Sequence, residues 1–430
     1  PTPTQLPTHT ATPEPKKLTI CIGQEPETLF LYGSSSRSMW SVLEAIYDGP
    51  IDTVNYQPVP VLLQELPTLE NGGVTLRTVS VTEGDEVVDT DGNLVALASG
   101  VKVFADLCTS PECAVEWDGT SPMSVVQMVV RFKLIDGVKW SDGQPLTAED
   151  SVFSYTVSAD PAMQVTKTNL DRTASYTAVD AVTVEWVGQP GYLTLSPSSF
   201  FWIPLPKHQL SGTTPGAMIY SDEIATLYPL GWGPYQIANW TVGESITLVK
   251  NPNYFRASEG LPDFDILEYK FLNGIPQPDI SPVVNGGCDI IDSSVNLSEQ
   301  IQPLRELELN GKAKAYFGMG PEWEGLNFGI KPASYDDVYN PYTDRPDFFG
   351  DVRIRQAFAY CIDREKITRT ILYSQSEVPV SYAPPGHPLA ASGLISYAHD
   401  PAKGIQLLEE VGWLDEDGDP ATPRLSSGVA

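Results

Sequence analysis

Three separated segments of this 430-residue chain form recognisable local units, and they restrict the fold more than any other feature. In 132–155 a strand-like run leads through a Ser-Asp-Gly-Gln-Pro turn into a helix. The segment 229–255 predicts strand, turn and strand, and 351–367 repeats apolar residues at helical spacing. None of the three carries a nucleophile, a base or a cluster of metal ligands. Because strands and helices alternate along the chain, we expect an α/β fold.

Local signals set the limits of several expected elements. Residues 18–22 predict a first strand, and the helical pattern after it stops at Gly49 and Pro50. Thr147 is placed to cap a helix, with Asp150 three residues later in a variant of the capping box. A last helix is expected to begin at the cap Asp400. Further helices are predicted near 297–309 and over 351–372, and the sequence WEGLNFGI predicts a strand at 323–330.

Residues 51–130 are rich in Val, Thr, Gly and Asp and alternate in short stretches. Glu-Gly-Asp and Asp-Gly-Asn sequences between these stretches are typical of hairpin turns. We therefore expect a β-rich subdomain inserted at about 51–175.

The charge balance narrows the range of partners. Lys and Arg number 26 and Asp and Glu number 55, which gives a formal net charge of −29. Such a charge opposes binding to nucleic acid or to an anionic membrane surface. No Gly-x-Ser-x-Gly motif occurs and the four histidines are scattered, so no catalytic, metal or cofactor site is predicted. With so many carboxylates, a secreted carboxylate-dependent hydrolase stays open as an alternative.

The five cysteines divide into two groups. Cys108 and Cys113 lie in a short Pro-containing loop, for which we favour a disulfide, with two free thiols or half of a zinc site as alternatives. Cys21 and Cys361 lie in apolar surroundings and are expected to be buried as small hydrophobic residues. The acidic run 415–420 fails the EF-hand pattern, since Pro420 stands where the loop needs Gly.

The first 17 residues are rich in Pro and Thr and lack apolar periodicity. They predict a disordered tether ahead of the folded chain. No run of 18 or more apolar residues occurs in the sequence. We expect a processed, exported protein.

In this order the three segments closely resemble the family 5 extracellular solute-binding proteins. The resemblance rests on KWSDGQPLTAEDSVFSY in the first segment, GWGPYQIANW and KNPNYF in the second, and DVRIRQAFAYCIDREKI as the third. The resemblance implies a two-lobed periplasmic-binding-protein-like fold (type II, cluster C), with lobe I at 18–274, lobe II at 275–430 and a hinge near 270–278. It implies a monomer, anchored by lipid outside the membrane or in the periplasm, that captures a solute unchanged. The solute would pass to the membrane subunits of an ABC importer. Peptide is the expected ligand, while nickel complexes and oligosaccharides occur in the same family.

The resemblance also carries candidate contact residues onto this chain. They come from the turn after the first strand, an aromatic segment, the Gly-Trp-Gly sequence and the WEGLNFG segment: Glu27, Thr28, Phe200, Phe201, Trp202, Trp232, Gly233, Trp323 and Asn327. Each aromatic residue among them could instead belong to the core. Gly231 and Gly233 could bring bare backbone to a ligand or serve a bulge alone. Trp232 departs from the Thr or Asn usual between these glycines.

The family pattern normally continues well beyond Trp413. We therefore expect lobe II to be incomplete in this chain, with unpaired sheet edges. That expectation keeps a third possibility open, a surface protein that retained the scaffold and lost its binding site.

Overall fold

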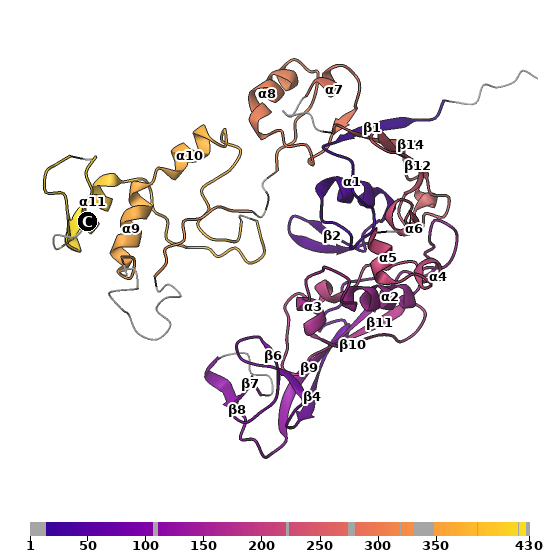
Figure 1. Cartoon of the computed structure of the whole chain (residues 1–430), viewed down its shortest axis with the longest axis horizontal. Helices are drawn as coiled ribbons and strands as arrows, with labels where there is room; N and C mark the ends of the chain where they lie inside the picture. Colours follow the sequence, from indigo (N-terminus) through magenta and orange to yellow (C-terminus); the bar gives the residue numbers. More distant parts are fainter. Residues whose placement is uncertain are drawn as a thin grey trace, which may run out of the picture. The chain divides into compact units, whose positions relative to one another are not determined.

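The first compact unit, Pro1–Glu299, is built around a five-stranded sheet (Figure 1). We describe a computed structural model, which covers residues 14–105, 111–220, 223–273, 280–318, 320, 322–330, 348–384, 386–419 and 421–426. The sheet runs in the order β12 (Tyr235–Thr241), β13 (Ser245–Lys250), β14 (Ile266–Phe271), β1 (Lys17–Ile22) and β15 (Ile290–Ile291). Strand β1 is parallel to both neighbours, and the β12–β13–β14 ladder is antiparallel.

Alternation along β1 explains its place in the sheet. Leu18, Ile20 and Ile22 pack on the core, so the intervening positions face the opposite side. Helix α1 (Arg37–Ile46) covers the core side with its buried face and is capped by Ser36, whose Oγ accepts from the backbone N–H of Met39 at 3.3 Å. The predicted first strand and the helix that follows it are both confirmed.

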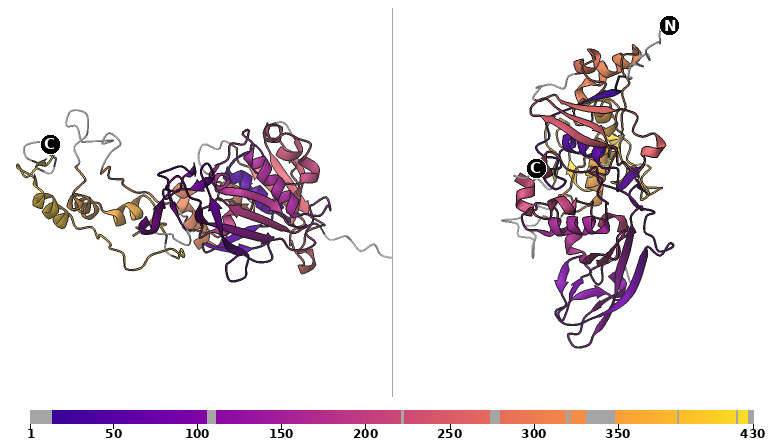
Figure 2. Two further views of the ribbon diagram at one scale, coloured as in Figure 1. Left: turned by 90° about the horizontal axis from the view of Figure 1, so that it is seen from below. Right: turned by 90° about the vertical axis from the view of Figure 1, so that its right-hand side faces the viewer.

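A second, antiparallel sheet forms the rest of the first unit. Its order is β10 (Thr173–Ala178), β11 (Thr183–Gly188), β9 (Met123–Lys133) and β4 (Val74–Val81). Two hairpins extend it, made of β5 (Glu86–Val88) with β6 (Leu94–Ala96) and β7 (Lys102–Phe104) with β8 (Ala114–Glu116). Figures 1 and 2 show the hairpins at the opposite end of the unit from β1 and β14. They enclose a small core of their own around Trp117, so the expected hairpins are present.

The predicted cap of helix α2 (Ala148–Ala159) is present and buried. Asp150 is 4% exposed, and its Oδ2 accepts from the backbone N–H and the hydroxyl of Thr147 at 2.8 and 3.2 Å. Its Oδ1 accepts from the backbone N–H of Lys207 at 3.0 Å. The carboxylate therefore ties α2 to α4. The remaining short elements of this unit are β2 (Ile51–Val54), β3 (Gln57–Pro60), α3 (Thr168–Asp171), α4 (Lys207–Leu210), α5 (Pro215–Tyr220), α6 (Glu223–Thr226) and α7 (Ser281–Val284).

The second compact unit is Gln300–Ala430. Its elements are α8 (Ile301–Leu309), α9 (Val352–Cys361), α10 (Arg364–Thr370), α11 (Pro401–Glu410), β16 (Trp413–Leu414) and β17 (Leu425–Ser426). The helix predicted near 297–309 is confirmed and begins at Ile301, and the helix predicted from Asp400 is also confirmed. The helix expected over 351–372 is interrupted, because Asp363 caps a new helix by accepting from Lys366 N at 2.8 Å. The strand expected at 323–330 is wrong, since 322–329 form neither strand nor helix.

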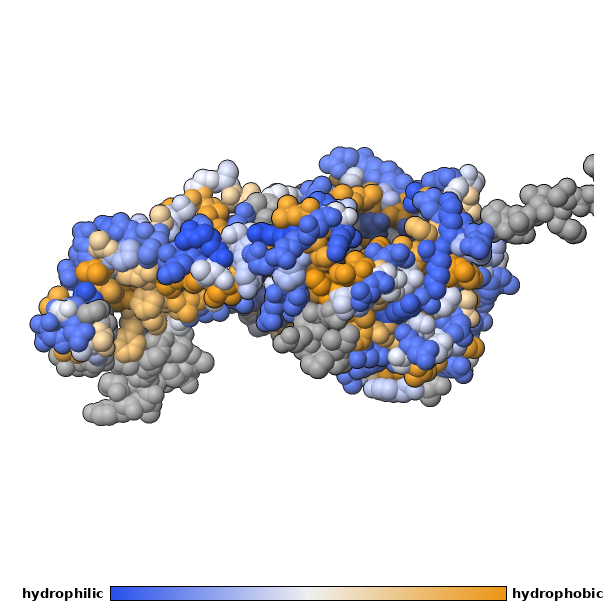
Figure 3. Space-filling view, turned by 90° about the horizontal axis from the view of Figure 1, so that it is seen from above, coloured by the Kyte–Doolittle hydropathy of each residue, from blue (hydrophilic) through white to orange (hydrophobic). Residues whose placement is uncertain are grey.

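The second unit buries few apolar side chains. Among its described residues the buried hydrophobic ones are Ile301, Ile354, Ala357 and Leu407. Figure 3 shows apolar surface between the polar residues of this unit. Its large exposed apolar residues include Leu309, Tyr316, Trp323 and Ile395. The first unit therefore contains most of the packed core, and the site described below is built on it.

Several expectations fall partly outside the described residues. Residues 1–13 of the predicted tether and 274–278 of the predicted hinge are not described, and β1 already begins at Lys17. The segment from Ser281 to Ile291 belongs to the first compact unit and pairs with β1. The predicted lobe limits therefore stay predictions. Within the described ranges, no helix combines the length and hydrophobicity needed to cross a bilayer.

The cysteines differ from expectation at two positions. Cys21 is buried as expected, but it forms a disulfide with Cys288, 267 residues later, instead of acting as a simple hydrophobic residue. Cys361 is exposed and free, which corrects its predicted burial. It sits at the end of α9, where the sparse packing of the second unit leaves it at the surface. Cys113 is disulfide-bonded, and because its predicted partner Cys108 lies outside the described residues, that pairing stays a prediction.

Candidate functional site

Two hydrogen bonds fix the turn after β1. Thr28 is 6% exposed, and its Oγ1 accepts from the backbone N–H of Phe30 at 3.0 Å. Leu29 donates its backbone N–H to the carbonyl of Thr226 at 2.6 Å. Glu27 is exposed at the surface. Of the two candidates in this turn, Glu27 is therefore open to a ligand and Thr28 shapes the backbone.

The aromatic segment 200–202, which begins at the last residue of the short 3-10 helix η2 (Pro197–Phe200), divides between core and surface. Phe200 is 2% exposed and lies 4.3 Å from Trp186 between ring centroids, and Phe201 packs on Phe132 at 5.2 Å. Trp202 is partly exposed. Its ring meets Tyr155 at 4.9 Å in an edge-to-face arrangement, a geometry that aromatic pairs favour. Trp202 is thus the member of this segment that reaches the surface.

The backbone of Trp202 is fixed by two neighbours. Its carbonyl accepts from Ser151 Oγ at 2.5 Å, and its N–H donates to the hydroxyl of Tyr176 at 3.2 Å. The ring of Tyr176 also lies 4.7 Å from the indole. A side chain held in this way keeps its orientation when a ligand arrives, which lowers the entropic cost of binding.

The Gly-Trp-Gly sequence lies inside the protein. Trp232 has no exposed surface, and its Nε1 donates to the carbonyl of Asp48 at 2.8 Å. Gly233 donates its N–H to the carbonyl of Ile46 at 2.7 Å. A Cβ on Gly231 would overlap that carbonyl oxygen. A backbone contact with the end of α1, which was neither of the two readings left open, explains these glycines, and neither Trp232 nor Gly233 is presented to solvent.

The last two candidates belong to the second unit. Trp323 is 55% exposed, and Asn327 is also exposed. Both lie in the irregular segment 322–329. The candidates from Glu27 to Gly233 therefore belong to the first unit, and Trp323 and Asn327 belong to the second.

A small cavity lies among the candidate segments of the first unit. Phe30 and Leu31 line it directly after the first turn, and Leu205 and Pro206 line it directly after the aromatic segment. Tyr47 also lines it and packs on Trp232 at 4.8 Å. The remaining lining residues are Gln209, Leu210, Ile224, Ala225 and Pro229. The walls are mostly apolar, apart from the amide of Gln209 and the phenol of Tyr47, and they leave room for little more than a water molecule.

Two buried phenols stand beside this region. Burial raises the pKa of Tyr47 above its ordinary value. Burial also raises the pKa of Tyr32 to about 12, although the hydrogen bond between its hydroxyl and Ser154 Oγ, at 2.6 Å, works in the opposite direction. Both phenols are therefore neutral at physiological pH, so neither brings charge to the cavity or to the aromatic surface.

The variant Tyr32→Phe tests the environment of this phenol through the pH dependence of the free energy of unfolding. A phenol with a higher pKa in the folded state favours the neutral form there, so its contribution to stability is complete below pH 10 and is lost as pH rises towards 12. The wild type should lose about 1 kcal/mol more than the variant between pH 10 and 11. At pH 7 the variant should be about 1 kcal/mol less stable, because the bond to Ser154 is gone. Urea unfolding at several pH values measures both differences.

Tyr220→Phe, at a side chain that is 77% exposed, is the matched control and should follow the wild type. Parallel pH curves for the wild type and Tyr32→Phe would contradict the assigned burial of the Tyr32 phenol.

Sequence reasoning missed the residues between the candidate segments. Tyr47 and Gln209 carry no motif, and Tyr155 is the last residue of the segment 132–155 but was not a candidate contact. Tyr47 and Gln209 line the same cavity only because α1 and α4, far apart in sequence, come together. Only the unusual density of aromatic residues in 200–202 signalled this part of the chain.

Comparison with known proteins identifies the scaffold. The family model "Bacterial extracellular solute-binding proteins, family 5 Middle" matches residues 110–427. The oligopeptide-binding protein AppA of Bacillus subtilis is 27% identical over 299 residues, which are 67% of this chain and 49% of AppA. The chain therefore spans about half the length of that curated relative.

Solved structures show the same fold. AppA from Bacillus subtilis, in complex with a nonapeptide, superposes with a TM-score of 0.53 at 18% identity, covering 96% of this chain and 68% of that one. NikZ from Campylobacter jejuni, in complex with Ni(L-His), gives 0.54 at 19% identity, with 96% and 66% covered. These similarities confirm the predicted α/β fold of two-lobed binding proteins. Because the family model matches residues 110–427, which are most of this chain, the chain belongs to the bacterial extracellular solute-binding proteins, family 5.

Proposed function

We propose that this protein captures a peptide or a similar small solute outside the membrane and delivers it, unchanged, to an ABC importer. The observation that carries the proposal is Trp202, a partly exposed indole held between Tyr155 and Tyr176. Rigid aromatic surface supplies contact area at a low entropic cost and tolerates many side chains. The peptide relative AppA supports peptide as the ligand class.

The Ni(L-His) complex of NikZ shows that proteins of this fold also bind other solutes. We therefore propose a peptide as the ligand of this chain on two grounds, the ligands of its relatives and its aromatic surface. Glu27, Trp323 and Asn327 stay proposed contacts, since each is exposed. We also propose a monomer attached to the outer face of the membrane through a lipid.

The first test is mass spectrometry of small molecules released when the natively purified protein is denatured. Release of intact peptides supports the proposal, and calorimetric titration with the same peptides then gives the affinity. A sugar or a metal chelate would replace the ligand and leave the family unchanged. Peptides that are cleaved during incubation would favour the hydrolase alternative. An empty protein that no peptide stabilises would favour a scaffold without a working site.

Trp202→Ala is expected to weaken binding of such a peptide about tenfold, because an aromatic contact near the centre of a site contributes about 1–2 kcal/mol. Trp202→Phe should recover most of the loss. Val242→Ala, at a side chain that is 77% exposed in the turn between β12 and β13, serves as the control. Titration calorimetry measures the three affinities. Equal affinities for the wild type and Trp202→Ala would remove Trp202 from the site.

A further inference from the structure

Trp202 belongs to a closed cycle of hydrogen bonds with two buried side chains. Ser151 Oγ lies 2.5 Å from the carbonyl oxygen of Trp202 and 2.7 Å from the hydroxyl oxygen of Tyr176. That hydroxyl oxygen lies 3.2 Å from the backbone nitrogen of Trp202. Ser151 is fully buried and Tyr176 is 3% exposed, whereas the indole of Trp202 is partly exposed. The cycle therefore begins and ends on the backbone of the one residue in this group that reaches the surface.

The chemistry of the three groups fixes the direction of each bond. A carbonyl oxygen can only accept, so Ser151 donates its single hydroxyl hydrogen to Trp202. The hydroxyl of Tyr176 must then donate to Ser151 Oγ, while its oxygen accepts the N–H of Trp202. Burial raises the pKa of the Tyr176 phenol, so the phenol keeps this proton at physiological pH. Because consecutive bonds that run in one direction strengthen one another, loss of either hydroxyl weakens the whole cycle.

The chain that follows Trp202 has separate anchors on helix α2. Leu205 donates its backbone N–H to the carbonyl of Asp150 at 3.2 Å, and Lys207 donates its backbone N–H to the carboxylate of Asp150 at 3.0 Å. Neither bond uses the hydroxyl of Ser151, so the segment stays attached to α2 when that hydroxyl is removed. What the cycle adds is control of the backbone at Trp202, from which the indole projects.

We propose that Ser151 is a positioning residue, which holds the indole of Trp202 in its binding orientation without touching the ligand. Tyr176 supports the same orientation through the cycle and through its ring, whose centroid lies 4.7 Å from that of the indole. A side chain that is fixed before binding loses less conformational entropy when the ligand arrives. The expected effect on affinity rests on the proposed function, whereas the expected effect on the indole does not.

The first measurement uses the full chain without ligand. The near-UV circular dichroism of the wild type minus that of Trp202→Phe gives the contribution of the Trp202 indole, which lies against the rings of Tyr155 and Tyr176. The same difference, taken between Ser151→Ala and the double variant with Trp202→Phe, should lose most of this band. An indole that samples several orientations gives little net signal.

The second measurement is titration calorimetry with an extended peptide of alanine and leucine. Ser151→Ala and Tyr176→Phe should each weaken binding about fivefold, because the indole must be ordered when the ligand binds. The two substitutions together should lose little more than either alone, since both open the same cycle. In a Trp202→Ala background, Ser151→Ala should cause no further loss of affinity. If Ser151→Ala does not fold, Tyr176→Phe opens the cycle while keeping its ring in place.

Ser158→Ala is the matched control. Ser158 is also buried on α2, at 2% exposed, but its Oγ donates within the helix to the carbonyl of Tyr155 at 2.8 Å. Its replacement should lower the unfolding temperature by about 2–4 °C, as Ser151→Ala does. The affinity and the Trp202 band should stay those of the wild type.

The inference is wrong if opening the cycle leaves the Trp202 band unchanged, or if Ser158→Ala weakens binding as much as Ser151→Ala. It is also wrong if the loss caused by Ser151→Ala persists in the Trp202→Ala background, because Ser151 would then act by another route. If the wild type does not bind the peptide but Ser151→Ala loses the band, the proposed function fails and the positioning of the indole by Ser151 stands.

Discussion

Replacing Cys21 and Cys288 together by alanine is expected to lower the free energy of unfolding of the first unit by about 2–5 kcal/mol. The bond joins residues that are 267 apart in sequence. A cross-link that closes so long a loop removes many conformations from the unfolded chain, so its effect lies at the upper end of what disulfides contribute. Both cysteines are at most 5% exposed, which shields the bond from reductants while the unit is folded.

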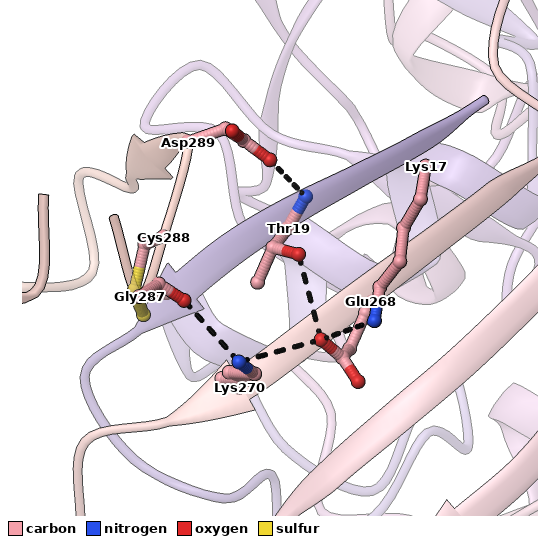
Figure 4. Close-up of a disulfide and its surroundings, with 8 residues drawn as sticks. Lys17, Thr19, Glu268, Lys270, Gly287, Cys288 and Asp289 are labelled. Carbon is pink, nitrogen blue, oxygen red and sulfur yellow. Dashed lines mark hydrogen bonds and ion pairs between the residues drawn. A yellow bond between two sulfur atoms is a disulfide. The ribbon is translucent and has the colours of Figure 1, made fainter.

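The disulfide also holds a short strand in place. Figure 4 shows Cys288 beside β1, where Asp289 accepts the backbone N–H of Thr19 through its Oδ2 at 2.8 Å. Strand β15 pairs with β1 through two residues only, Ile290 and Ile291. Lys270 on β14 adds a bond from its Nζ to the carbonyl of Gly287 at 3.2 Å. Without the covalent link, this edge of the sheet would depend on a few partly exposed hydrogen bonds.

Urea unfolding, followed by tryptophan fluorescence, measures the loss of stability in the double variant. Cys361→Ala is the matched control, because this thiol is free and exposed, and it should stay within about 0.5 kcal/mol of the wild type. Hydrogen exchange at β15 should become faster in the double variant. An unchanged unfolding midpoint would mean that the sheet edge is held by its hydrogen bonds alone.

Gly231→Ala is expected to cost about 3 kcal/mol or more, and to reduce the yield of folded protein. An added Cβ would overlap the carbonyl oxygen of Ile46, at the end of α1. That oxygen also accepts the N–H of Gly233 at 2.7 Å. Because backbone atoms on both sides make the contact, no side chain can rotate away. The two segments would have to separate, which would disturb the packing of Trp232.

Gly212→Ala is the control, since its added Cβ would meet no heavy atom within 4 Å. Thermal unfolding of the two variants should differ by many degrees. If Gly231→Ala folds with wild-type stability but loses peptide affinity, the glycines serve a ligand and not the contact with α1. That result would restore the reading in which bare backbone at this sequence faces the solute.

Many local elements were predictable because their signals lie within a few residues. Alternating apolar residues marked β1, and a cap with its partner three residues later marked α2. The motifs that resemble family 5 proteins carried the fold class and the solute-binding role. The strand expected at 323–330 failed, because a strand needs a neighbour and the described segment has none. A second helix start at Asp363 competed with the long helix predicted over 351–372.

The candidate site was predicted less completely. Aromatic composition pointed to residues 200–202 but could not separate the buried Phe200 and Phe201 from the partly exposed Trp202. Glycine spacing pointed to 231–233 but could not tell a ligand contact from a backbone contact with Ile46. Each of these distinctions depends on which distant segment packs against the residue.

The sequence by itself determined the α/β class, the main strands and helices of the first unit, and the family to which the chain belongs, because periodicity, caps and motifs are local properties. The tertiary structure alone decided that Cys21 pairs with Cys288 and that Trp232 is core. These features join residues far apart in the chain. Their positions follow from how sheets and helices pack, which no short pattern encodes.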